Sequence, residues 1–347
     1  MTRVLVTGGA GFIGSHVVDK LRDAGHEPVI YDMRPSPWHD DVDFVRGDLA
    51  DTDRLAEALA GCGAVAHLAA AADVDAVTKD PQGAEATNAR GTASVLEAAR
   101  RAGVDRVLYA STIWVYSDVD TAAVDEDCPL RPPSHLYTAT KLAGELYCHS
   151  YSELYDVDYT ILRFGIPYGP RARPAAVVPA MVGRALAGEA LTIAGDGLQT
   201  RRFVYVEDLA DGVVRALAPC AVNRVYNLVS DEDVSIKRVA ETVCSVVGDA
   251  RIEYTPGRSG DFGGVVVSGD RARDELGWTA STPFEEGVRR YVASVRSPTP
   301  AQPARSAADR FENVRRELAP LSLLGIIVAC LSDAGSVEPI IDAAPLA

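Results

Sequence analysis

The stretch Thr7-Gly8-Gly9-Ala10-Gly11-Phe12-Ile13-Gly14 decides the fold of this chain. It follows a short apolar run at residues 3–7 and precedes a helical pattern of apolar residues that ends at Gly25. Glycines let the backbone turn tightly and approach a pyrophosphate, which the N-terminus of the next helix attracts through its N–H groups and partial positive charge. Because a plain glycine turn can also join a strand to a helix, the motif needs support from its context.

An acidic residue downstream supplies that support. A second apolar run, residues 28–31, ends at Asp32, whose carboxylate would accept hydrogen bonds from an adenosine ribose and repel a 2′-phosphate. The sequence therefore favours NAD over NADP, although Arg34 is a residue that could tolerate a phosphate. Asp48 follows a third expected strand, and it is placed either to meet the adenine or to cap the next helix.

Alternating strand and helix patterns continue along the chain. They predict an α/β fold, a Rossmann domain with a doubly wound parallel sheet, over residues 1–170, which also hold the catalytic residues. The looser pattern of residues 171–296 predicts a smaller C-terminal α/β substrate-binding lobe interleaved with the last strands of the sheet. Residues 297–347 read as a linker and a tail of unknown role. The expected strands are 42–45, 64–68, 106–110, 159–164 and 191–193, and the expected helices are 53–60, 84–102, 136–155, 178–187, 206–217, 235–247 and 283–296.

Composition narrows the class of protein. The 347 residues are 47% hydrophobic and 24% charged, as in an ordinary globular protein, and the net charge of −15 argues against binding to nucleic acid. No CxxC pair occurs among the six cysteines, so we expect no metal site and no disulfide framework. The apolar stretch at residues 321–331 is too short to span a membrane, and we see no signal peptide. We expect a cytoplasmic protein.

A tyrosine and a lysine lie four residues apart on one predicted helix face, at Tyr137 and Lys141. A phenol titrates near about 10, too high for a base at neutral pH, but a nearby ammonium and a positive nicotinamide would favour the phenolate. Tyr137 would then be a usable proton acceptor. Any helix can carry such a pair, so its value comes from its place downstream of the glycine turn, with Ser111 and Thr112 ending an intervening strand.

Taken together, these motifs resemble the NAD-dependent nucleotide-sugar epimerase/dehydratase family of extended short-chain dehydrogenases/reductases, and most of all its UDP-sugar 4-epimerases. The matching segments run from Val4 to about Tyr291, which is most of the chain. They are Thr7–His16, His67–Ala70, Asn88, Ser111–Tyr116, Tyr137–Lys141, Leu162–Pro170, Gly195–Asp208 and Arg258–Asp261. Several ordered motifs make the match specific for the superfamily, and less specific for the substrate.

The resemblance also implies roles for individual residues. Tyr137 would exchange a proton with a sugar hydroxyl, Lys141 would hold the nicotinamide ribose, and Thr112 would hydrogen-bond the reacting oxygen, with Ser111 beside it. Fork-shaped guanidinium groups suit phosphate oxygens. The implied substrate-binding residues are Thr112, Tyr137, Arg201, Arg258 and Asp261, the two arginines gripping the diphosphate. The implied NAD-binding residues are Gly8, Gly11, Phe12, Ile13, Gly14, Asp32, Asp48, Leu49, Leu68, Ala69, Ala70, Asn88, Tyr137 and Lys141.

Departures from the family pattern decide which reaction we expect. The family's 4,6-dehydratases carry an Asp-Glu pair, and its decarboxylases a Glu, where this chain has Ile113 and Trp114, which transfer no protons. What remains is 4-epimerisation of a nucleotide sugar, which we expect to be a UDP-hexose, with transient hydride transfer from C4 to bound NAD. An NAD-dependent nucleotide-sugar dehydrogenase or 4-ketoreductase with net redox turnover uses the same residues and stays the alternative. A non-catalytic NAD-binding protein is a third reading.

Other departures concern the substrate and the partner. Ile166 replaces a usual Asn, Arg202 stands at a usual Asp and would add positive charge, and Val265 leaves room that some hexose epimerases fill with an aromatic ring. Trp114 would instead narrow the pocket. Many relatives form homodimers through a four-helix bundle, for which residues 84–102 and 136–155 are the candidates here.

Overall fold

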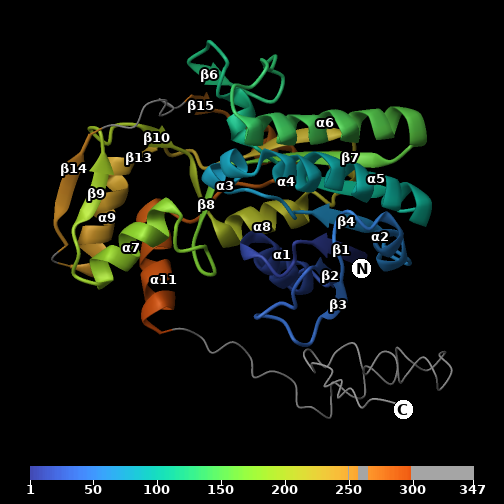
Figure 1. The fold of residues 1–347 in the computed structure, drawn as a ribbon, viewed down its shortest axis with the longest axis horizontal. Coiled ribbons are helices and arrows are strands. Elements are labelled where there is room, and N and C mark those ends of the chain that lie inside the picture. Colours follow the sequence, from blue (N-terminus) through green and yellow to red (C-terminus); the bar gives the residue numbers. More distant parts are fainter. Residues whose placement is uncertain (249, 257–264, 298–347) are drawn as a thin grey trace, which may run out of the picture. The chain divides into compact units, whose positions relative to one another are not determined.

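The computed structural model describes residues 1–248, 250–256 and 265–297. In it the chain forms a parallel sheet of seven strands, which run from β1 near the N-terminus to β12 in the later part of the chain (Figure 1). The strand order β12-β7-β5-β4-β1-β2-β3 reverses direction of progress between β1 and β4, as in a doubly wound Rossmann sheet. The prediction of this fold class is confirmed. The strands are β1 (Arg3–Thr7), β2 (Glu27–Asp32), β3 (Asp43–Arg46), β4 (Ala64–His67), β5 (Arg106–Thr112), β7 (Asp158–Phe164) and β12 (Arg224–Leu228).

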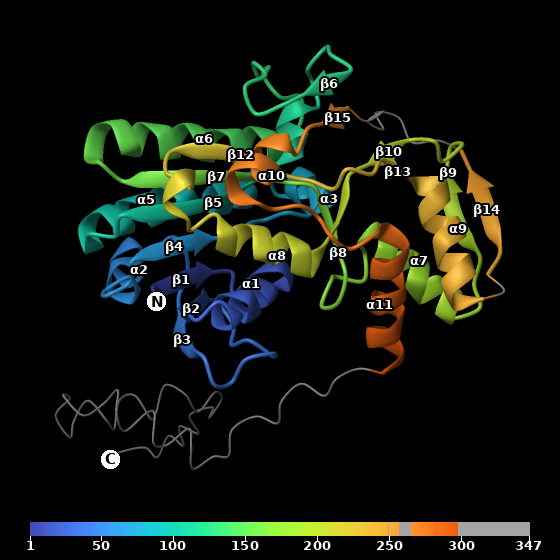
Figure 2. The same ribbon diagram turned by 180° about the vertical axis from the view of Figure 1, so that it is seen from behind.

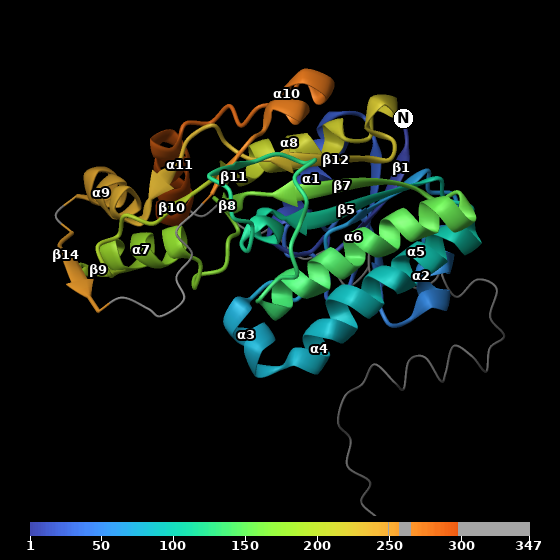
Figure 3. The ribbon, with the colours of Figure 1, turned by 90° about the horizontal axis from the view of Figure 1, so that it is seen from above.

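Helices cover both faces of this sheet, because its buried strands are apolar on both sides. In β1, Val4 and Val6 pack with one set of helices and Leu5 packs with the other. Figure 3 shows the sheet between these two layers. The first layer contains α1 (Phe12–Asp23), α8 (Val206–Arg215) and α10 (Asp270–Leu276), and the second contains α2 (Thr52–Ala58), α5 (Gly91–Ala102) and α6 (Leu136–Tyr155).

A second core lies in the later part of the chain, where α7 (Val177–Leu186), α9 (Ile236–Val247) and α11 (Phe284–Arg296) pack with β9 (Leu191–Ala194) and β14 (Ile252–Thr255) (Figure 2). The chain returns to the first core through α8 and β12 between these elements. Short pairings complete the topology, and they involve β6 (Ala123–Val124), β8 (Ile166–Tyr168), β10 (Thr200–Arg201), β11 (Phe203–Tyr205), β13 (Val234–Ser235) and β15 (Val266–Val267).

One predicted helix is interrupted. The single helix expected over residues 84–102 is in fact α4 (Pro81–Glu85), a π-helical turn (Ala86–Arg90) and α5. A π turn is rare and often marks a functional site, and here it contains Asn88. The sequence pattern also missed β12, α10, the short helix α3 (Val74–Lys79) and a 3₁₀ turn over Ile113–Tyr116.

Among the described residues, no helix combines the length and the hydropathy needed to cross a bilayer. The same residues contain no group of three or more His, Cys, Asp or Glu side chains that could hold a metal ion. The expected tail, residues 298–347, lies outside the described part of the chain.

Candidate functional site

Close backbone contacts shape the glycine turn between β1 and α1. Gly8 has a φ of 72°, and a Cβ there would lie 2.8 Å from the backbone nitrogen of Ala69. A Cβ at Gly14 would lie 2.1 Å from the carbonyl oxygen of Gly8. Only glycine fits at both positions, so α1 begins close against the turn, with Gly11 exposed at its N-cap and Phe12 and Ile13 in its first turn. A pyrophosphate fits this cradle of N–H groups.

The Asp32 carboxylate lies beside the same turn, at the end of β2. Its Oδ2 accepts a hydrogen bond from the backbone N–H of Ala10 at 3.2 Å, and its Oδ1 accepts one from that of Arg34 at 3.2 Å. Asp32 is only half-buried, so its carboxylate keeps acceptor capacity toward a ligand. The location beside the pyrophosphate cradle is the one that a ribose of NAD requires.

Asp48 follows β3 and does not cap the next helix. Asp51 caps α2 by accepting a hydrogen bond from the Arg54 backbone N–H at 3.0 Å. The Oδ1 of Asp48 instead accepts one from the Ala50 backbone N–H at 2.9 Å. The interpretation of Asp48 as a helix cap is therefore wrong, and its role toward the adenine stays a prediction, as does that of the neighbouring buried Leu49.

Asn88 holds the segment that follows β4, one wall of the proposed NAD site, against α6. Its Oδ1 accepts a hydrogen bond from the Ala71 backbone N–H at 2.8 Å, and its Nδ2 donates to the Ala71 carbonyl at 3.0 Å and to Thr140 Oγ1 at 3.1 Å. Both amide hydrogens and the amide oxygen are thus engaged with protein atoms. Asn88 ties the segment Leu68–Ala71 to α6, and it shapes the site through that segment.

His67 is a residue of this wall that sequence reasoning named only as part of a motif. Its Nδ1 lies 2.7 Å from Thr7 Oγ1, and its Nε2 lies 3.1 Å from Thr92 Oγ1. Since Thr92 donates its own proton to the Asn88 carbonyl, Nε2 must carry the ring proton. Burial, and then the charge of Lys141, lower the pKa of His67 to about 3, so this ring is neutral and structural.

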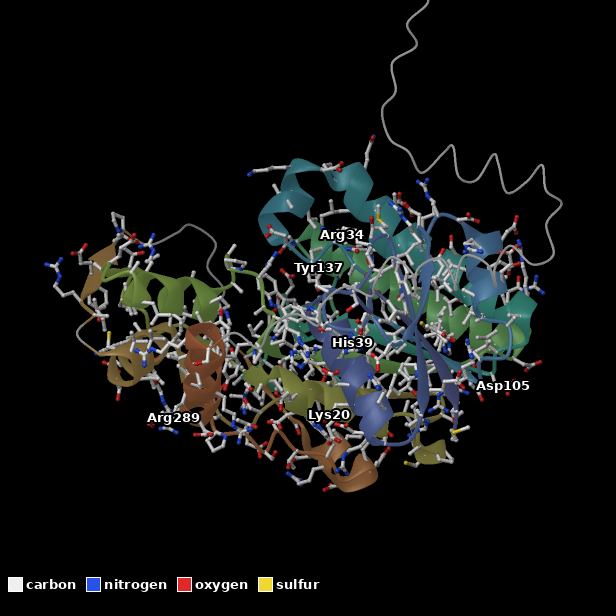
Figure 4. The ribbon with its side chains drawn as sticks, turned by 90° about the horizontal axis from the view of Figure 1, so that it is seen from below. Lys20, Arg34, His39, Asp105, Tyr137 and Arg289 are labelled. Carbon is white, nitrogen blue, oxygen red and sulfur yellow. The ribbon has the colours of Figure 1, made fainter. Side chains whose placement is uncertain are left out.

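Thr112 and Tyr137 meet where β5 ends and α6 begins. Figure 4 shows Tyr137 at the carboxyl end of the sheet, away from Asp105, which precedes β5. His135 caps α6 by accepting a hydrogen bond at Nδ1 from the Tyr137 backbone N–H at 3.1 Å. Burial raises the pKa of Tyr137 to about 12, against the opposing effects of a hydrogen bond with Thr112 and of the Arg173 charge. In the protein alone, Tyr137 is therefore a neutral phenol at physiological pH.

Lys141 is buried one helical turn further along α6. Its Nζ donates a hydrogen bond to the Ala110 carbonyl at 2.8 Å and lies 5.2 Å from the centre of the Tyr109 ring. Burial lowers the pKa of Lys141 to about 8, and the charge of Glu145 acts in the opposite direction. The side chain therefore remains mostly a cation near pH 7, as a role in supporting a phenolate requires.

Ser111 faces a buried polar network. Its Oγ donates a hydrogen bond to Glu145 Oε1 at 2.5 Å. Arg163 holds the same carboxylate with two hydrogen bonds, from Nε at 3.0 Å and from Nη2 at 2.7 Å, and it also donates from Nη1 to the Tyr116 hydroxyl at 2.6 Å. Sequence reasoning missed Glu145 and Arg163. The position of Glu145, four residues after Lys141 on the same helix, was the available signal.

A small pocket beside the 3₁₀ turn that follows Thr112 is lined by the residues that depart from the family pattern. It is largely apolar, with polar groups from one arginine-containing segment and one aspartate. Its lining residues are Ile113, Trp114, Ile166, Thr200, Arg201, Arg202, Asp233, Val265 and Val267. The predicted residues Arg258 and Asp261 lie outside the described residues, so the structure does not place them.

The positive charge expected from Arg202 is neutralised. Its Nε lies 2.8 Å from Asp233 Oδ1, and its Nη1 donates to the Ser230 carbonyl at 2.8 Å. Arg202 is buried, and Asp233 is partly exposed. The expectation of extra positive charge in the pocket was wrong, because pairing of β10 with β13 brings Asp233 beside it.

The chain matches known proteins in sequence and in structure. A model of the NAD dependent epimerase/dehydratase family matches residues 4–228. The UDP-glucose 4-epimerase of Mycolicibacterium smegmatis is 35% identical over 312 residues, which cover 85% of this chain and 99% of that protein. The structure of Thermus thermophilus UDP-glucose 4-epimerase in complex with NAD superposes with a TM-score of 0.78 at 32% identity, covering 86% of this chain and 100% of its own.

A second reaction type occurs among the similar structures. A dTDP-glucose 4,6-dehydratase from Streptomyces venezuelae, solved with NAD bound, has a TM-score of 0.79 and 30% identity, covering 85% of this chain and 97% of its own. The chain is thus similar to NAD-binding enzymes that epimerise and to others that dehydrate.

Proposed function

Because the chain belongs to the NAD-dependent epimerase/dehydratase family and uses NAD as its cofactor, we propose that it is a 4-epimerase of a nucleotide sugar, a UDP-hexose. The resemblance to UDP-glucose 4-epimerases covers nearly their whole length. The observation that carries the choice of reaction is the apolar character of the two residues after Thr112. Ile113 and Trp114 line the pocket and offer no group for the elimination that a 4,6-dehydratase must catalyse.

The remaining acid of the pocket does not alter this choice. Asp233 is held by the ion pair with buried Arg202, so its carboxylate is committed to that guanidinium. Removing its negative charge would leave Arg202 unpaired. We therefore assign no proton transfer to Asp233, and Tyr137 is the acid/base of the proposed reaction.

The chain's own residues supply acid/base chemistry and orientation. NAD supplies, when bound, a reversible acceptor for a hydride. Tyr137 would take the proton of the sugar 4-hydroxyl and return it, while Thr112 holds the same oxygen by a hydrogen bond. Because the Tyr137 pKa is about 12 in the protein alone, a usable base requires the added positive charge of the bound cofactor beside the Lys141 ammonium.

We extend the proposal to the substrate and the domain division. Arg201 lines the pocket and would grip the diphosphate, with Arg258 and Asp261 assigned to the same substrate by the motif that they share. Residues 1–170 would bind NAD, and residues 171–296 would bind most of the nucleotide sugar.

A homodimer belongs to the same proposal. Helices α5 and α6 lie side by side on one face of the sheet (Figure 3). Outward from α6 point Leu146, Tyr147 and Leu154, with exposed fractions of 59%, 38% and 69%. An exposed apolar stripe of this kind suits burial against a second copy. Sedimentation of the wild-type chain and of a Leu146→Glu, Leu154→Glu double variant, which should sediment as a monomer, tests this point.

Incubation of the purified enzyme with UDP-sugars, without added cofactor, tests the function. The anomeric protons of UDP-glucose, UDP-galactose, UDP-glucuronate and UDP-N-acetylglucosamine are followed by NMR. A 4-epimer that grows to an equilibrium supports the proposal and names the sugar. Conversion only when NAD or NADH is supplied stoichiometrically would instead support a nucleotide-sugar dehydrogenase or 4-ketoreductase.

We propose a cytoplasmic location, since the five cysteines of the described part are free thiols.

A further inference from the structure

The carboxylate of Glu145 joins three elements of the site. It lies on α6, its side chain is 6% exposed, and it accepts hydrogen bonds from Ser111 at the end of β5 and from Arg163 on β7. Ser111 and Arg163 are direct partners in the register of β5 and β7. The residue after Ser111 is Thr112, so the position of the Thr112 backbone depends on a strand end that Glu145 holds.

Glu145 also balances the charges of the same region. Its carboxylate forms an ion pair with the buried Arg163 guanidinium at 2.7 Å. Glu145 also lies one helical turn after the buried Lys141, whose ammonium form its negative charge favours. A buried cation without an opposing charge loses its proton or is destabilised, because the protein interior solvates charge poorly. The Ala110 carbonyl is the hydrogen-bond acceptor of Lys141 Nζ, but a carbonyl brings no negative charge.

We propose that Glu145 is a positioning residue of the active site, which holds the Ser111–Thr112 strand end in place and keeps the Lys141 side chain a cation. The inference rests on the proposed function for its effect on rate. Its effect on Lys141 is independent of which sugar the enzyme uses. The Glu145 carboxylate is bonded to Ser111 and Arg163, so Glu145 would act on the reaction through Ser111 and Lys141.

The titration of Lys141 gives the most direct test. The chain contains four lysines, Lys20, Lys79, Lys141 and Lys237, so ¹³C-labelled lysine gives few NMR signals in the purified holoenzyme. Loss of one signal in a Lys141→Met variant assigns Lys141. Its pKa is lowered by burial only to about 8 while Glu145 opposes the change, so Glu145→Gln should lower the titration midpoint by at least about one pH unit.

Rate measurements test the same inference on the reaction. In Glu145→Gln, the alkaline limb of the pH–rate profile should move down with the Lys141 midpoint, and kcat at pH 8 should fall at least about fivefold. Glu241→Gln is the matched control, because Glu241 lies four residues after Lys237 on α9 but is exposed. It should leave the Lys141 signal and the rate unchanged.

Three outcomes decide the matter. A folded Glu145→Gln protein with an unmoved Lys141 midpoint, or with a lower rate but an unchanged pH profile, overturns the inference. If Glu145→Gln does not fold, Glu145→Asp takes its place. Its shorter side chain moves the carboxylate away from Lys141, so the Lys141 titration midpoint should fall by a smaller amount. An unchanged midpoint overturns the inference. A Lys141 midpoint that moves as expected in an enzyme without epimerase activity supports the role of Glu145 and contradicts only the proposed function.

Discussion

The Oγ1 atom of Thr7 lies 2.7 Å from Nδ1 of His67, where the neighbouring strands β1 and β4 end. This contact crosses the point at which the strand order of the sheet reverses, which is where α/β sheets of this kind bind ligands. Thr7 Oγ1 also accepts a hydrogen bond from the Ala69 backbone N–H at 3.3 Å. The glycine turn and the segment after β4 are therefore fixed to each other on both sides of the proposed NAD site.

Acid should destabilise the protein through His67. Its folded-state pKa of about 3 lies below the ordinary 6.5, so the unfolded chain binds more protons between these values. The stabilisation is complete above pH 6.5 and is lost as pH falls, by at most about 1.4 kcal/mol per pH unit. Urea unfolding measured between pH 7 and 4.5 should show a smaller fall in the free energy of unfolding for His67→Gln than for the wild type. The acid-induced loss of stability that remains in His67→Gln includes the contribution of His16, whose pKa burial lowers to about 4. Equal slopes in both proteins would contradict this assignment.

Removal of the Tyr137 hydroxyl should lower turnover strongly without loss of the cofactor. In Tyr137→Phe we expect kcat to fall by about 10²- to 10⁴-fold, the usual contribution of a positioned acid/base. The bound NAD, measured after denaturation of the purified protein, should stay at the wild-type level. A variant that retains more than about a tenth of the wild-type rate would show that another group transfers the proton.

Asp32 should set the preference for NAD. Replacement by alanine removes the acceptor for the ribose and the hydrogen bond to the Ala10 backbone N–H, so NAD affinity should fall about tenfold. NADP should bind better than to the wild type, because the repelling carboxylate is gone and the nearby Arg34 carries a positive charge. Fluorescence titration of cofactor-stripped protein with both dinucleotides measures the ratio. An unchanged ratio would remove Asp32 from the cofactor site.

The ion pair between Arg202 and Asp233 should matter more for stability than an exposed pair. In Asp233→Asn, the buried guanidinium loses its counter-charge, and we expect the free energy of unfolding to fall by about 1–3 kcal/mol. Asp211→Asn removes the ion-pair partner of exposed Arg215 and should change the free energy of unfolding by less than about 1 kcal/mol. Chemical denaturation compares the two, and similar losses would mean that Arg202 is solvated without its partner.

The sequence alone predicted the sheet and the order of its main elements because those depend on local patterns. The glycines at positions 8 and 14 were recognisable, since their need for close backbone contact leaves only one residue type. Glu145 was not recognisable as part of the site. Its contact with Ser111 joins residues 34 positions apart, and the packing of α6 on β5 decides it.

The charge of the pocket that Ile113 and Trp114 line also could not be predicted from the sequence. Arg202 read as an added positive charge because Asp233, its partner, comes 31 residues later and reaches it only through the antiparallel pairing of two-residue strands. Such short strands have no periodicity to detect. The π-helical turn at Asn88 was likewise hidden, because its residues Ala86–Arg90 fit an ordinary helical pattern.

The most direct test of the epimerase assignment is the fate of the hydrogen at C4. UDP-glucose deuterated at C4 is incubated with the purified holoenzyme in ordinary water, without added cofactor, and the products are examined by NMR. The proposed function predicts UDP-galactose that keeps its deuterium at C4, because the hydrogen returns to the opposite face of the same sugar. Loss of deuterium from C4, or accumulation of a keto sugar instead of the 4-epimer, would contradict it.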